Sequence, residues 1–112
     1  MESPIAELSL QARSAERGDF KVRVLVGTPV PSKRAPWVCP MAIDGLMSKG
    51  TEAGGGDSMQ ALCLALWFVA QELYRFVEKG GQLWYAGDDP SKSFPIEAYF
   101  RAFGPSLGKG AA

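Results

Sequence analysis

The architecture depends most on GGGDSMQALCLALWFVAQELYRFVEKGG, residues 54–81. Between Ser58 and Lys79 the apolar residues recur at intervals of three and four, which predicts an amphipathic helix of about 22 residues, roughly 33 Å long. Asp57 is a favourable N-cap residue, and Gln60 three positions later completes a variant of the capping box. We expect the three glycines before Asp57 to act as a hinge and the two glycines after Lys79 to end the helix.

This predicted helix carries apolar side chains on two sides. At about 100° per residue, Leu64 and Phe68 point nearly opposite the main stripe, and Trp67 lies on the flank. A helix that covers one sheet needs a single apolar stripe of about 100°. The second apolar side is therefore covered by the C-terminal helix or is an interface with another protein. The main stripe comprises Met59, Leu62, Cys63, Leu66, Val69, Ala70, Leu73 and Val77.

Segments before and after the helix alternate apolar and polar residues, a pattern that predicts half-buried strands. The polar segment SAERGD separates the first two strands and predicts a hairpin loop. The proline-rich segment TPVPSKRAP, residues 28–36, predicts an extended connection at a sheet edge. The predicted strands are residues 4–13, 20–28, 37–46 and 82–86, with a further short strand around residues 46–53.

These elements predict an α+β fold, in which an antiparallel meander of three or four strands packs on one long helix. A last strand and a short C-terminal helix over residues 95–103 complete it. A chain of 112 residues is expected to form one domain, here residues 1–104, followed by a flexible tail at 105–112.

Composition limits the classes of partner and the location. Twelve Lys and Arg residues balance twelve Asp and Glu residues, so the chain lacks the positive charge that nucleic-acid binding requires. The longest apolar stretch, residues 61–70, is shorter than the roughly 20 residues that span a bilayer. The N-terminus lacks the features of a signal peptide. We therefore expect no nucleic-acid partner, no membrane partner and a cytoplasmic location.

The chain contains no histidine. This removes the usual general base near neutral pH, the Ser-His and Cys-His nucleophile pairs, and histidine metal sites. We therefore expect no catalytic residues, no cofactor and no metal site, and we predict that the protein is not an enzyme.

Two cysteines are the first residues to weigh against that prediction. Cys39 lies in the strand motif WVCP, residues 37–40, and Cys63 lies on the predicted helix. A redox thiol usually has a resolving cysteine nearby, and a zinc site needs more ligands than two cysteines. A Cys-Pro dipeptide can present a thiolate to haem, but this one lies within an alternating strand. We expect Cys39 and Cys63 to be small buried hydrophobic residues between sheet and helix.

Two further groups could in principle hold a ligand. Residues 54–56 could bind an anion through backbone amides, but they lack the Lys and Ser/Thr of a phosphate-binding loop, and Asp57 would repel phosphate. Asp88, Asp89 and Glu97 could form a carboxylate cluster for a divalent cation. Their spacing fits no calcium loop, and Asp-Asp-Pro is an ordinary turn sequence. Both groups are interpreted as structural.

Four short motifs lie along the chain: Trp37-Val38-Cys39-Pro40, Ile43-Asp44-Gly45, Gly56-Asp57-Ser58-Met59-Gln60-Ala61-Leu62 with Ala65-Leu66, and Gly80-Gly81-Gln82-Leu83. In these motifs the sequence resembles a family of small bacterial proteins classed only as a domain of unknown function. The resemblance covers roughly residues 20–86 and implies a bacterial source and a stand-alone α+β domain. It implies no activity and no catalytic residues.

Two classes of function are compatible with these observations. The first is a non-enzymatic protein–protein interaction module that uses Leu64, Trp67 and Phe68 to bind a second copy of itself or another protein. Toxin-neutralising immunity proteins are one kind of small cytoplasmic binder in this class. The alternative is a small-ligand-binding domain or minor enzyme with a pocket between sheet and helix, lined by Trp37, Trp84 and Tyr85.

Overall fold

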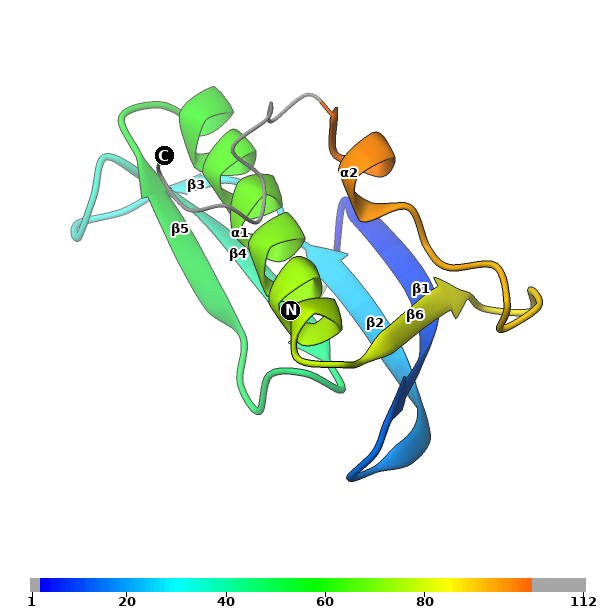
Figure 1. Ribbon diagram of the computed structural model, residues 1–112. Coiled ribbons are helices and arrows are strands. Elements are labelled where there is room, and N and C mark those ends of the chain that lie inside the picture. The colour runs from blue at the N-terminus through cyan, green and yellow to red at the C-terminus, as the bar shows by residue number, and fades with distance from the viewer. Residues whose placement is uncertain (1–2, 102–112) are drawn as a thin grey trace.

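A six-stranded sheet and two helices make up residues 3–101, the part of the chain that the computed structural model describes (Figure 1). The α+β fold predicted from the sequence is confirmed. The elements are β1 (Ala6–Ser14), β2 (Gly18–Val26), β3 (Val30–Pro31), β4 (Trp37–Asp44), β5 (Thr51–Gly55), α1 (Ser58–Glu78), β6 (Gln82–Tyr85) and α2 (Ile96–Tyr99).

All strand pairs in the sheet are antiparallel. The strand order is β3-β4-β2-β1-β6, and β5 pairs with β4. The predicted hairpin is formed by β1 and β2, in a register that places Leu10 opposite Val22. The alternation of these two strands directs their apolar side chains to the face that α1 covers.

The strand predicted around residues 46–53 is β5, shifted toward the helix. It spans Thr51–Gly55, so Gly54 and Gly55 belong to a paired strand and do not form a hinge. A side chain at position 55 would place its Cβ 2.5 Å from the backbone nitrogen of Ala61 on α1. Glycine is therefore required here because the strand and the helix backbone are in direct contact.

The proline-rich segment, predicted as an extended connection at a sheet edge, contains the short strand β3, which pairs with β4. Gly27 donates a backbone hydrogen bond to Pro40 (2.8 Å), and the next pair along β4 involves Val30 of β3. Residues 28–29 therefore lie opposite the single residue Cys39. This arrangement is a β-bulge, and the missing N–H of Pro29 is tolerated there because a bulge residue is not paired. β3 thus continues the line of β2 beyond the bulge.

Helix α1 begins and ends as predicted. Asp57 Oδ1 accepts a hydrogen bond from Gln60 N (2.7 Å), and Gln60 Oε1 accepts one from Gly56 N (2.6 Å). These two bonds form a variant of the capping box. Lys79 is the C-cap, and Gly80 follows with a φ of 101°, which favours glycine.

The buried stripe of α1 differs from the predicted stripe. Met59, Cys63 and Val77 are exposed, whereas Leu62 and Leu66 are half-buried. The small residues Ala61 and Ala65 face the sheet instead, because the close approach at Gly55 leaves no room for larger side chains. The buried residues of α1 are Ala61, Ala65, Val69, Ala70 and Leu73.

The C-terminal helix is shorter than predicted and packs on the core. Within the described residues α2 spans only Ile96–Tyr99 of the predicted 95–103, and both Ile96 and Phe100 are buried. Phe94 is also buried, and its N–H donates to the carbonyl oxygen of Leu83 in β6 (2.8 Å). Figure 1 shows α2 at the β1–β6 side of the sheet, with α1 over β4 and β5. The predicted tail, residues 105–112, lies outside the described residues.

A search of the helices within residues 3–101 finds none with the length and apolar character needed to cross a membrane.

Candidate protein interface

The first fourteen residues of α1, Ser58–Gln71, contain no charged side chain, and Glu72 is the first. Part of this segment faces solvent: Leu64 is 40% exposed and Trp67 is 38% exposed. Phe68 is half-buried and packs against the core. Depletion of charge together with an exposed tryptophan is typical of the centre of a protein interface. We refer to Leu64, Trp67 and Phe68 as the α1 flank.

The α1 flank lies on the side of the helix away from α2. Leu66 and Val69 line a small apolar groove together with Phe100, which follows α2. At about 100° per residue, Leu64 points roughly 160° away from Leu66. The sequence left open whether the C-terminal helix or another protein covers the second apolar side of α1. In the structure α2 covers the side of α1 opposite Leu64. Phe103, the last residue of the predicted C-terminal helix, lies outside the described residues.

The residues of the predicted pocket do not come together. Trp37 lies on β4 and packs against the core on the α1 side of the sheet. Trp84 lies on β6, separated from β4 by β2 and β1. Tyr85 follows it and contacts Phe94, with ring centroids 5.1 Å apart. The three aromatic residues therefore do not line one pocket between sheet and helix.

Trp84 is buried on the opposite face of the sheet. It pairs with Gln11, whose neighbours Leu10 and Ala12 point into the core, so Trp84 and Gln11 point away from α1. The guanidinium of Arg13 lies over the indole, 5.1 Å from the ring centroid. This contact covers the ring, and Trp84 is a structural residue.

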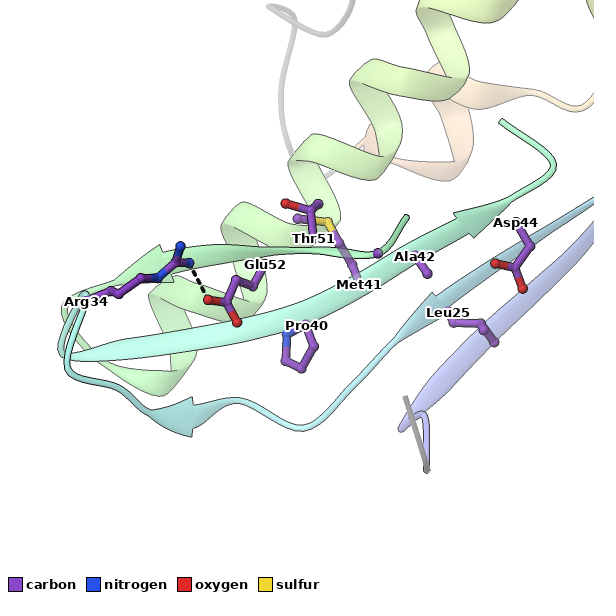
Figure 2. Close-up of a pocket in the computed structure, with 9 residues that line it drawn as sticks. Leu25, Arg34, Pro40, Met41, Ala42, Asp44, Thr51 and Glu52 are labelled. Carbon is purple, nitrogen blue, oxygen red and sulfur yellow. Dashed lines mark hydrogen bonds and ion pairs between the residues drawn. The ribbon is translucent and has the colours of Figure 1, made fainter. Parts of the chain in front are cut away.

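An open depression of about 730 Å³ lies beside β4 and β5 (Figure 2). Leu25, Pro40 and Ala42 give it an apolar floor on the face away from α1. Its polar groups are not convergent: Arg34 and Glu52 form an ion pair at one end, and Asp44 lies at the other. A specific small-molecule site needs a few polar groups aimed at one point, and this depression lacks that arrangement.

The two cysteines have different environments. Cys39 is fully buried, and its Sγ lies 3.4 Å from the carbonyl oxygen of Gly27. Burial raises the pKa of the Cys39 thiol, so the nucleophilic thiolate is disfavoured. Cys63 is exposed on α1, so the prediction that both cysteines are buried is wrong for Cys63. The error arises because the helix packs on the sheet through its alanines.

The acidic residues near the C-terminal helix form turn contacts. Asp88 Oδ1 accepts a hydrogen bond from Asp89 N (2.8 Å), and Asp89 Oδ1 accepts one from Ser91 N (2.9 Å). The bond from Ser91 lowers the pKa of the Asp89 carboxyl. Lys92 lies 3.8 Å from Asp88 in an ion pair. In the part of the chain that the structure describes, no three Cys, Asp or Glu side chains gather into a metal-binding group.

Comparison with known proteins identifies the family. A family model described as Domain of unknown function (DUF6968) matches residues 6–96, from the first residue of β1 to the first residue of α2. No curated protein and no solved structure matches the chain. Because the matched segment includes the whole sheet and α1, the chain belongs to the family of domains of unknown function DUF6968.

Proposed function

We propose that this protein is a non-catalytic interaction module that binds a second copy of itself through the α1 flank. The observation that carries the proposal is the uncharged helix segment Ser58–Gln71, which exposes Leu64 and Trp67 to solvent. Burying such side chains in a partner removes apolar surface from water, at about 25 cal/mol per Å². The motif resemblance supports a bacterial source, and two free cysteines are consistent with a reducing cytoplasm.

A second copy is the occupant that the chemistry of the flank favours. In a two-fold dimer the same patch faces itself, so any charged residue in its centre would oppose an identical charge. The α1 flank has no charge within Ser58–Gln71, and this self-pairing therefore carries no like-charge penalty. Leu64 and Trp67 are large enough to supply the buried anchors that dominate interface energy.

Replacing Leu64 with glutamate tests the proposal. A carboxylate buried in an apolar interface without a partner is costly, so we expect the dissociation constant of the dimer to rise by at least about tenfold. Sedimentation velocity over a dilution series measures this constant. Met59→Glu is the matched control, because Met59 is 69% exposed on another side of the same helix. A wild-type chain that stays monomeric at every concentration, or a Leu64→Glu dimer of unchanged affinity, would contradict the proposal.

A further inference from the structure

The two edge strands of the sheet, β6 and β5, differ in whether another segment covers them. At the β6 edge, the N–H of Phe94 donates to the carbonyl oxygen of Leu83, so the segment before α2 covers this strand. At the other edge, β5 pairs with β4 alone. Among the described residues, no backbone hydrogen bond reaches the outer side of β5. An unpaired strand edge is a template for a strand from another chain.

The register identifies the backbone groups at this free edge. The carbonyl oxygen of Pro40 accepts a hydrogen bond from Gly27 on the β2 side. Because backbone groups alternate in direction along a strand, those of Trp37, Cys39 and Met41 face β5. The first, third and fifth residues of β5 pair with these three residues, so their backbone groups face β4. The backbone groups of Glu52 and Gly54 therefore point outward. Glu52 and Gly54 are both exposed.

The free edge and the α1 flank lie on the same side of the molecule. Helix α1 contacts β5 and β4 (Figure 1). Ala61 of α1 touches Gly55 of β5. Leu66 and Val69 point toward β1 and β2, away from β5. Leu64 lies on the opposite side of the helix from Leu66, and it therefore points over the β5 edge.

We infer that the second copy docks by pairing its own β5 antiparallel with this β5, which extends the sheet across both molecules. The inference rests on the proposed self-association and adds a backbone component to it. Neighbouring strands lie roughly 4.8 Å apart, and α1 lies over β4 and β5. The axes of the two α1 helices would then be separated by about two strand spacings, roughly 10 Å, which is the distance at which helices pack. The two α1 flanks would then meet above the joined sheet.

The sequence of β5 suits pairing with itself. The strand TEAGG contains neither lysine nor proline, the residues that usually block an exposed edge. In a register with Ala53 opposite Ala53 of the second copy, each Glu52 lies opposite Gly54 of the other copy. This register pairs the outward-facing backbone groups and keeps the two Glu52 carboxylates from lying directly opposite each other.

Glu52→Pro tests the inference. Proline removes the outward N–H at position 52 but no hydrogen bond to β4. Glu52→Ala is the matched control, because both variants lose the ion pair with Arg34 and only the proline alters the backbone donor. We expect Glu52→Pro to weaken dimerisation by at least about tenfold and Glu52→Ala to stay within about threefold of wild type.

Amide exchange on the wild-type chain tests the same point without a variant. Exchange rates measured by NMR at the Glu52 and Gly54 amides should fall as the concentration rises through the dimer dissociation constant. A dimer that leaves these two rates and the Glu52→Pro affinity unchanged overturns the strand pairing but leaves the α1 flank as the interface. A dimer lost in Glu52→Pro but intact in Leu64→Glu supports the strand pairing and contradicts the proposed function. A wild-type monomer at all concentrations overturns both.

Discussion

Pro40 removes one hydrogen-bond donor from the middle of β4, and the residues around it compensate. In a hydrogen-bonded antiparallel pair, the two opposite residues normally exchange two backbone hydrogen bonds. Gly27 donates to Pro40, but Pro40 has no N–H to return. The thiol of Cys39, 3.4 Å from the Gly27 carbonyl oxygen, takes the place of that donor. Strand geometry therefore accounts for Cys39 and Pro40 of the WVCP motif.

The two thiols should differ in reactivity. Cys39 is buried with a raised pKa, whereas Cys63 is exposed on α1. We expect iodoacetamide to modify Cys63 at least about a hundredfold faster than Cys39 in the native protein, because Cys39 reacts only after local opening. Mass spectrometry of the labelled peptides measures both rates, and labelling in concentrated urea is the control in which the difference should disappear. Equal native rates would show that Cys39 is accessible.

At the level of elements, α1 packs on β5 through backbone contact. Gly55 lies against Ala61, and the helix turns its alanines toward the sheet at this point. Small residues allow the two backbones to approach, and larger residues then project to either side of the helix. This close packing leaves Leu64 exposed at the side of α1.

Gly55→Ala tests this contact. The new Cβ would lie 2.5 Å from the backbone nitrogen of Ala61, so the helix must shift, and we expect a loss of about 1–3 kcal/mol in the free energy of unfolding. Gly56→Ala is the control, since its Cβ would meet only the end of the flexible Gln60 side chain, at 3.3 Å. Both variants restrict the unfolded chain equally. Urea denaturation compares them, and a Gly55→Ala variant as stable as Gly56→Ala would exclude the contact.

For the whole molecule, the asymmetry of the sheet is the main feature. Phe94 and α2 close the β6 side, whereas on the β5 side no described residue pairs with the outer edge of the strand and the helix flank beside it is uncharged. Within residues 3–101, one side of the domain is covered by Phe94 and α2, and the other exposes backbone and apolar groups. We propose that the second copy binds on that side.

Self-association should make stability depend on concentration. For a dimer that dissociates as it unfolds, the free energy of unfolding rises by about 1.4 kcal/mol per tenfold rise in protein concentration, and this gain is shared between two chains. For a domain of this size we expect the melting temperature to rise by about 3 °C per tenfold concentration. Scanning calorimetry at several concentrations measures it, with Leu64→Glu as the comparison in which the rise should begin only at concentrations at least about tenfold higher. A concentration-independent wild-type melting temperature would argue against a dimer.

Local patterns in the sequence were enough to predict much of the fold. The helix from Ser58, its cap at Asp57 and the alternation of β1 and β2 depend on neighbouring residues, and all three are confirmed. The α+β class follows from the order of such elements. The candidate interface residues Leu64, Trp67 and Phe68 also follow from helical spacing, and their role stays a prediction.

Long-range contacts settled the rest. Periodicity gives the angles between side chains on a helix, but it does not say which angle faces the sheet, so the burial of Ala61 in place of Cys63 depended on Gly55 beneath it. Strand order likewise depends on pairing between distant segments, which separated Trp37 from Trp84 and placed β5 at an edge of the sheet that the described strands form. Those outcomes depend on how close two backbones come and on which strands pair, quantities set by the packing of the whole chain.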